Sequence, residues 1–194
     1  SQEKTLKNIN FEIKSGETLG IIGSTGSSKS TLVQLIPRLY DVTEGSVAVG
    51  GVDVREYDIE ALRDQVAFVL QKNTLFSGTL RENMRWGNEN ATDEQIIEAL
   101  KHAQAWEFVS QYDDGLDHWV EQGGENFSGG QKQRLVIGLA MINDPLILFL
   151  DEPTTGLDPQ ARRNTWDILL DLKRNGKTII LTTHYMEEAE LLSD

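Results

Sequence analysis

A lysine-containing loop near the N-terminus has the residue types that bind phosphate groups. Residues 23–31 nearly match the pattern GxxxxGK[ST], and they follow a short apolar run, Thr18–Ile22. Such a loop between a strand and a helix presents backbone N–H groups to phosphates. We expect Lys29 to reach the β- and γ-phosphates of a nucleotide and Ser30 to bind magnesium. The predicted nucleotide-binding residues of this loop are Gly23, Ser24, Thr25, Gly26, Ser27, Ser28, Lys29, Ser30 and Thr31.

Position 28 departs from this pattern. The pattern requires a glycine immediately before the lysine, and this chain has Ser28. A residue with a Cβ atom costs about 1–2 kcal/mol in the left-handed backbone conformation, and its side chain takes space from phosphate oxygens. Two hypotheses therefore stay open: a working nucleotide site, and a nucleotide-binding fold in which binding is impaired or absent. A plain Ser/Gly-rich connector is a third, weaker explanation.

Acidic and imidazole side chains follow two later apolar runs. Asp151 and Glu152 come directly after the apolar residues 146–150, and His184 follows the apolar run 178–182. We expect Asp151 to hold magnesium through water, and Glu152 to orient or deprotonate an attacking water. His184 is placed to contact the γ-phosphate. An acidic pair in a simple turn and a structural histidine are the competing explanations.

A Ser-Gly-Gly-Gln segment precedes a helical pattern that runs to Ile142. The four residues are Ser128, Gly129, Gly130 and Gln131. A helix N-terminus led by serine and two glycines presents backbone N–H groups to an anion. We expect these residues to complete a nucleotide site on a second copy of the domain.

Apolar periodicity and turn residues predict the elements that position these side chains. The expected strands are residues 6–13, 18–22, 66–70, 146–150 and 178–182, with a hairpin over 47–53 around Gly50-Gly51. The expected helices are residues 29–39, 93–112, 129–142 and 159–174, with Thr92 and Asp158 as N-terminal caps. Strands alternating with helices predict a parallel sheet that is covered on both faces.

Length, charge and composition exclude several function classes. The 194 residues suit one domain, and the absence of cysteine excludes a disulfide framework and a cysteine-type zinc site. Acidic residues outnumber basic ones 31 to 18, which argues against a nucleic-acid-binding surface. No apolar run reaches the length of a membrane span. We expect no direct membrane insertion and no nucleic-acid partner.

Together, these segments resemble the nucleotide-binding domain of the ATP-binding cassette (ABC) family over essentially the whole chain. In that resemblance, residues 23–31 are the Walker A motif, 146–152 the Walker B motif and 128–131 the signature. The resemblance implies that Gln71 links magnesium and the attacking water to a transmembrane partner. It also implies that Asp158 lies in the loop that crosses a dimer, and that His184 is the switch histidine.

The resemblance implies an α/β fold with a P-loop NTPase core. A mixed or parallel sheet would be flanked by helices and joined by an antiparallel β-subdomain and an inserted α-helical subdomain. Residues 1–71 and 144–194 would form the core and β-subdomain, and residues 72–143 the helical subdomain, within one domain (1–194) truncated at both ends relative to the family.

The implied function is ATP binding and hydrolysis that powers a membrane exporter. Two such domains, as a homo- or heterodimer, would sandwich ATP and Mg²⁺ and act on transmembrane domains from the cytoplasmic side. Catalytic roles fall to Glu152, His184 and Gln71, and magnesium ligation to Ser30, Gln71 and Asp151. A cassette protein acting on DNA or ribosomes is disfavoured by the negative charge and by the absence of a long coiled-coil insertion.

The resemblance is uneven along the chain. Residues 74–83 and 122–125 resemble exporters with fused membrane and ATPase domains, whereas residues 153–158 and 183–189 resemble separate ATPase subunits of drug-resistance exporters. The family also stacks adenine on an aromatic ring just before the first strand, and Tyr40 and Tyr57 lie in the wrong segments for that role. We expect the lack of such a stacking ring to weaken adenine binding by about 1–3 kcal/mol.

Overall fold

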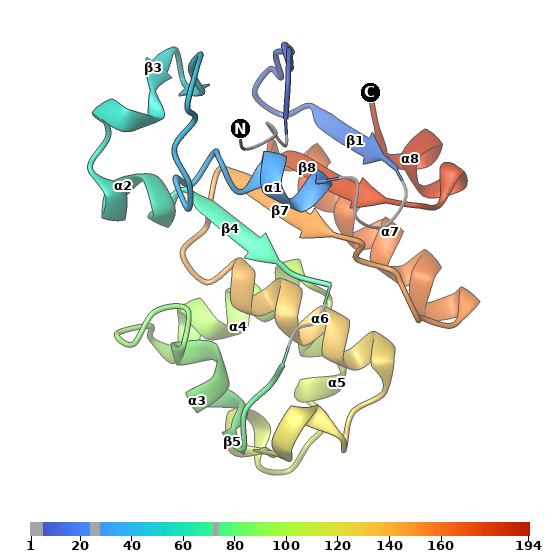
Figure 1. Ribbon diagram of the computed structural model, residues 1–194. Helices are drawn as coiled ribbons and strands as arrows, with labels where there is room; N and C mark the ends of the chain where they lie inside the picture. The colour runs from blue at the N-terminus through green and yellow to red at the C-terminus, as the bar shows by residue number, and fades with distance from the viewer. Residues whose placement is uncertain (1–5, 24–27, 72–73) are drawn as a thin grey trace.

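A four-stranded parallel sheet lies at the centre of the computed structural model, which describes residues 6–23, 28–71 and 74–194 (Figure 1). The strands, in spatial order, are β1 (Thr18–Ile22), β8 (Thr178–Thr183), β7 (Ile147–Asp151) and β4 (Val66–Val69). In register, Thr18 pairs with Ile179, and Val66 pairs with Ile147. Because all four strands are parallel, their carboxyl ends lie at one edge of the sheet.

Helices and two short antiparallel strand pairs make up the other regular elements. The α-helices are α1 (Lys29–Val33), α2 (Ile59–Asp64), α3 (Leu80–Arg85), α4 (Asp93–His102), α5 (Trp106–Val109), α6 (Gly129–Ala140), α7 (Pro159–Arg174) and α8 (Met186–Leu192). The 3-10 turns are η1 (Val54–Glu56), η2 (Gly115–Asp117) and η3 (Gln122–Gly124). A tight antiparallel hairpin pairs β2 (Ala48–Val49) with β3 (Val52–Asp53), and a second antiparallel pair joins two strands distant in sequence, β5 (Gly78–Thr79) and β6 (Trp119–Val120).

Successive residues of β7 pack into two different hydrophobic clusters. Leu148 and Leu150 belong to a large cluster that includes Trp166 of α7. Phe149 belongs to a smaller cluster with Val33 of α1. Since successive side chains of a strand point to opposite faces, both faces of the sheet are covered, as the apolar runs predict.

Helices α3 to α6 gather beside the β4 edge of the sheet (Figure 1). Helix α6 contacts α3, α4, α7 and β4, and so joins this helical group to the sheet. The division of the chain at residues 71 and 143 stays a prediction. No helix within the described ranges has both the length and the apolar character needed to cross a bilayer.

Most predicted elements are confirmed where the sequence carries an explicit start or stop signal. The Asp158 carboxylate caps α7 by accepting from the backbone N–H groups of Gln160 and Ala161, and Gly176, with φ of 83°, follows its last turn. Thr92 and Gln95 form the predicted capping box of α4. The Gly50-Gly51 hairpin, the helix after Gly129 and the four strands of the parallel sheet are also present.

Three predictions differ from the structure. The strand expected at residues 6–13 is wrong: this segment is irregular, and its alternating residues Ile9 and Phe11 are exposed, so no sheet face buries them. The helix expected at 29–39 ends at Val33, ahead of Pro37. The helix expected at 93–112 breaks after His102, because Gln104 has a φ of 53° and cannot continue a right-handed helix.

Candidate functional site

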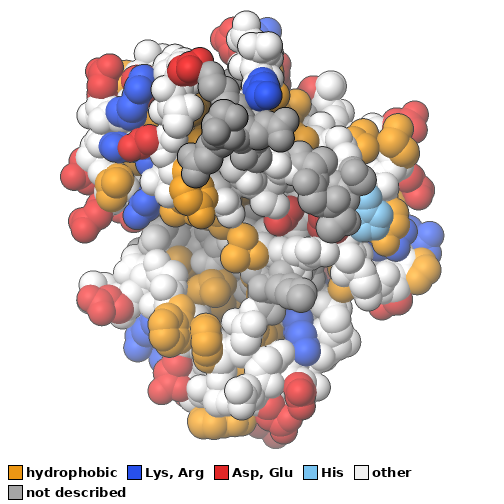
Figure 2. Space-filling model, in the orientation of Figure 1, with side chains coloured by type: hydrophobic (Ala, Val, Ile, Leu, Met, Phe, Trp, Pro, Cys, Tyr) orange, Lys and Arg blue, Asp and Glu red, His pale blue; other side chains and the backbone are white. Residues whose placement is uncertain are grey.

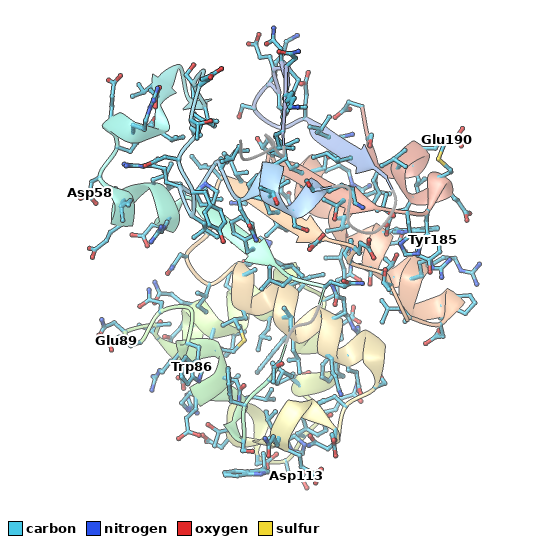
Figure 3. All side chains as sticks on the ribbon, in the orientation of Figure 1. Asp58, Trp86, Glu89, Asp113, Tyr185 and Glu190 are labelled. Atoms are coloured by element: carbon cyan, nitrogen blue, oxygen red, sulfur yellow. The ribbon has the colours of Figure 1, made fainter. Side chains whose placement is uncertain are left out.

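Four segments from distant parts of the sequence meet at the carboxyl edge of the parallel sheet. The lysine loop follows β1, Gln71 follows β4, Asp151 ends β7 and His184 follows β8. Figures 1 and 3 show these strand ends facing the same side of the molecule. In open α/β sheets this edge is the usual place for ligand binding.

The lysine and serine of the predicted loop both point at neighbouring site residues. Lys29 is 8% exposed, and its Nζ donates to the carbonyl oxygen of Gly23 at 2.8 Å. Ser30 Oγ donates to Asp151 Oδ2 at 2.9 Å. Thr31 lies one residue further along α1. The predicted residues Ser24, Thr25, Gly26 and Ser27 lie outside the described residues.

The backbone at Ser28 has the conformation that explains the glycine of the pattern. Its φ of 61° and ψ of 21° are left-handed, and it stands at the N-cap position of α1. Among the described residues, no N–H group of α1 donates to the Ser28 side chain. The serine therefore bears the conformational cost of its Cβ atom without the compensation of a cap.

The Glu152 carboxylate is the centre of the site. Its Oε2 accepts from Gln71 Nε2 at 3.1 Å and from Thr155 Oγ1 at 3.2 Å. His184 Nδ1 lies 3.3 Å from the same oxygen, and Lys29 Nζ lies 3.9 Å from Oε1. The structure thus brings together three predicted catalytic residues, Gln71, Glu152 and His184, with the predicted phosphate-binding lysine.

Glu152 also has a strained backbone. Its φ is 49°, an uncommon value for a residue that is not glycine, and Pro153 follows it. A proline normally keeps the preceding residue extended, so this conformation costs about 1–3 kcal/mol. The Glu152 N–H donates to the carbonyl oxygen of Thr182 at 3.0 Å, which fixes the residue to the end of β8. Backbone strain of this kind concentrates at functional sites.

Asp151 has the surroundings of a magnesium ligand. Besides Ser30, the hydroxyl of Thr182 donates to its carboxylate, at Oδ1. Hydroxyl and carboxylate oxygens are hard ligands, which Mg²⁺ prefers and which it often binds together with substrate phosphates and water. Ser30 and Asp151 therefore fit a magnesium ion next to phosphate. Gln71 directs its amide nitrogen toward Glu152, so its carbonyl oxygen is not used in that bond.

The Ser-Gly-Gly-Gln segment forms the N-terminus of α6. Ser128 caps the helix, and Gln131 completes a capping box with it. A Cβ atom on Gly130 would lie 2.8 Å from the Cβ of Ala161 on α7, so the two helix starts pack closely. Among the described residues, no hydrogen bond or ion pair joins Ser128 or Gln131 to the Glu152 carboxylate.

A groove of about 180 Å³ runs between the N-terminal ends of α6 and α7. It is lined by Ser128, Gly130, Gln131, Arg134, Asp158, Gln160, Ala161 and Asn164. Hydrogen bonds from the backbone N–H groups of Ala161 and then Gln160 hold the pKa of the Asp158 carboxyl below its usual value. The predicted residues Gly130 and Asp158 thus face one groove, apart from the Glu152 cluster.

The sequence interpretation missed two threonines of the site. Thr155 donates to Glu152, and Thr182 donates to Asp151. The position of Thr182 at the end of a buried strand, level with Asp151 in the register, was an available signal. Thr155 carried no signal that would separate it from an ordinary turn residue.

Comparison with known proteins identifies the family. The model of the family described as "ABC transporter" matches residues 6–155. The chain is 41% identical over 178 residues to ABC transporter B family member 14 of Arabidopsis thaliana, covering 92% of this chain and 14% of that protein. It is 40% identical over 179 residues to an ATP-dependent lipid A-core flippase of Desulfotalea psychrophila, covering 92% of this chain and 31% of that protein.

A solved structure supports the same assignment. A bacterial Atm1-family ABC exporter with ATP bound matches 95% of this chain and 32% of its own chain, with a TM-score of 0.83 and 29% sequence identity. The chain therefore spans about a third or less of the relatives that it matches. This match shows that the chain has the P-loop NTPase α/β fold. The chain belongs to the ABC transporter family and is an ATP-binding domain of the exporter type.

Proposed function

We propose that this chain binds and hydrolyses ATP and thereby powers a membrane exporter. The observation that carries the proposal is the convergence of Lys29, Ser30 and Asp151 with the Gln71–Glu152–His184 cluster at one edge of the sheet. One group of these residues suits phosphate and magnesium, and the other suits the activation of water.

Glu152 Oε2 is the proposed acceptor of the proton of the attacking water. As the water oxygen bonds to the γ-phosphorus, the bond from that phosphorus to the leaving ADP oxygen breaks. The Gln71 amide and the Thr155 hydroxyl hold the Glu152 carboxylate. His184 Nδ1 lies 3.3 Å from the same oxygen, and from there the histidine can contact the γ-phosphate. Magnesium, when bound at Ser30 and Asp151, would neutralise charge on the phosphates.

We propose that the groove at the starts of α6 and α7 completes the nucleotide site of a second domain. The backbone N–H groups of α6 behind Ser128 suit a phosphate, and the Asp158 carboxylate lines the same groove. Within one chain this groove is separate from the Glu152 cluster, so two chains placed head to tail would form two complete sites.

ATP-driven dimerisation tests the proposal. A Glu152→Gln variant should retain ATP and accumulate as a dimer with Mg-ATP, seen as a doubling of molar mass by light scattering. Replacing Ser128 by Arg in the same variant should abolish the dimer, because its side chain fills the groove. A monomer at saturating ATP, with nucleotide bound, would contradict the sandwich arrangement.

We propose a docking surface for transmembrane domains at the aromatic pair Phe76–Trp86. The two rings stack with centroids 4.9 Å apart, and they are 49% and 70% exposed. Figure 3 shows Trp86 on the outer side of α3, and Figure 2 shows hydrophobic side chains gathered on this part of the surface. Phe76 is five residues from Gln71 in the sequence, so the pair lies on the same segment as the Gln71–Glu152 contact. This surface would face the membrane from the cytoplasmic side.

A second candidate function is an ABC fold with impaired nucleotide binding. The left-handed backbone of Ser28 favours it, because the conformation that cradles phosphate is strained in this chain. Such a domain would fold and dimerise as an interaction module with little turnover. The affinity of the chain for Mg-ATP, compared with that of its Ser28→Gly variant, separates the two candidates.

A further inference from the structure

One buried carboxyl group has no role in the proposed reaction. Glu188 on α8 has 0% exposed surface. Its Oε1 accepts from Thr154 Oγ1 at 2.7 Å and from Trp166 Nε1 at 2.9 Å. Its Oε2 is buried and accepts no hydrogen bond from the described residues. A buried carboxyl is costly unless donors meet it, so these two donors explain its place in the core.

The two donors lie on segments that carry the proposed catalytic machinery. Thr154 is fully buried in the turn that leaves Glu152, where the Thr155 N–H donates to the carbonyl oxygen of Glu152 at 3.2 Å. Trp166 is a buried residue of α7, the helix that Asp158 caps. Through one oxygen atom, Glu188 joins this turn and α7 to the helix that begins two residues after His184.

The strained backbone of Glu152 needs support on both sides. On the strand side, its N–H is held by the carbonyl oxygen of Thr182. On the turn side, the buried Thr154 is fixed by its hydrogen bond to Glu188. A residue with positive φ keeps that conformation only where the surrounding structure fixes it, so the Glu188 contact opposes relaxation of Glu152.

The His184 side of the cluster is tied to α7 in a similar way. The ring of Tyr185 lies 4.1 Å from the ring of His184, and the Arg162 guanidinium on α7 lies 4.2 Å above the Tyr185 ring. Figure 3 shows Tyr185 between α7 and α8. Tyr185 and Glu188 thus tie the segment that directly follows His184 to α7.

We propose that Glu188 is a positioning residue that keeps Glu152 and His184 in contact for water activation. This inference rests on the proposed ATPase function. The hydrogen bond to Thr154 fixes the turn of Glu152, and the bond to Trp166 fixes α8 against α7. Loss of the acceptor oxygen lets the turn and α8 move independently, which separates the catalytic carboxylate from the histidine.

The first arm of the test needs no nucleotide. Backbone amide resonances of Glu152, Thr155 and His184 are compared in Glu188→Ala, Glu188→Gln and Thr154→Val. We expect Glu188→Ala and Thr154→Val to shift all three resonances, and Glu188→Gln to shift them little, because glutamine keeps the acceptor oxygen. Glu187→Gln and Glu190→Gln, on exposed positions of the same helix, are the matched controls. Shifts confined to α8 in folded Glu188→Ala would overturn the proposal.

The second arm measures turnover in a Ser28→Gly background. We expect Glu188→Ala to lower kcat about 10- to 100-fold with KM within twofold, since a displacement of about 1 Å at reacting groups has an effect of this size. Glu188→Gln should stay within about threefold of its parent. Equal losses in the Ala and Gln variants, or a loss confined to KM, would overturn the positioning role.

The two arms separate this inference from the proposed function. If the Ser28→Gly parent releases no phosphate, the ATPase proposal fails, and the resonance shifts still decide whether Glu188 holds the Glu152 turn. If Glu188→Ala does not fold, Thr154→Val decides, because it removes one hydroxyl and keeps the side-chain shape.

Discussion

Replacement of Ser28 by glycine should tighten nucleotide binding. The left-handed conformation at Ser28 costs a residue with a Cβ atom about 1–2 kcal/mol, and the missing cap bond means that removal of the hydroxyl loses no contact with α1. The greater freedom of a glycine chain offsets about 0.5–1 kcal/mol of the gain. At the middle of both ranges the net gain is about 0.75 kcal/mol, which corresponds to a Kd for Mg-ATP that is about threefold to fourfold lower.

The assay is a titration of a fluorescent ATP analogue and of unlabelled Mg-ATP against the chain and two variants. Ser28→Ala keeps the Cβ atom and lacks the hydroxyl, so it should bind like the original chain. Asn8→Gly relieves a positive φ of 54° at an exposed position and should leave the affinity unchanged.

Two results would refute this reasoning. An unchanged Kd in Ser28→Gly would show that backbone strain at position 28 does not limit binding. Equal improvement in Ser28→Ala and Ser28→Gly would assign the effect to the hydroxyl instead of the Cβ atom. Failure of all variants to bind would contradict the assignment of this loop as the phosphate site.

Three further predictions concern the helix starts and the aromatic pair. Gly130→Ala places a Cβ atom 2.8 Å from that of Ala161 and should destabilise the fold by about 1–3 kcal/mol in urea unfolding, whereas Gly129→Ala, whose nearest neighbour would lie at 3.4 Å, should cost less; equal costs would contradict the packing argument. Asp158→Ala should lower the melting temperature at pH 7. Because the pKa of this carboxyl is lowered on folding, the difference should be constant above about pH 4 and shrink as the pH falls through the lowered value; a difference that grows in acid would have the wrong sign. In a chain joined to an exporter transmembrane domain, Trp86→Ser should reduce substrate-stimulated ATP turnover and leave the basal rate within twofold, and loss of the basal rate would refute a docking role.

Capping residues and apolar runs in the sequence predicted the helix starts and the buried strands. Asp158 and Thr92 mark helix starts because their side chains accept from backbone N–H groups a few residues on. The strands of the parallel sheet are continuous apolar runs because both faces are buried. The alternating segment 6–13 looks equally strand-like, but alternation alone supplies no neighbouring strand, and the segment is irregular.

The site was predictable only where a residue belongs to a spaced motif. Lys29, Asp151 and Glu152 stand at such positions, and the structure brings them within hydrogen-bond or ion-pair distance of their neighbours. Thr154 and Glu188 meet across 34 residues of sequence, and no local pattern encodes that contact. Helices α2, α3 and α8 were not predicted, because each is too short for a clear apolar period.

Release of phosphate from Mg-ATP tests the central proposal most directly. The measurement compares the chain and its Glu152→Gln variant at saturating ATP, with bound nucleotide followed in the same samples. We expect the chain to release phosphate in excess of its own concentration, and the variant to bind ATP while turnover falls at least 100-fold, because the proton acceptor is lost. Absence of release from the chain with ATP bound, or equal release from both proteins, would contradict the account.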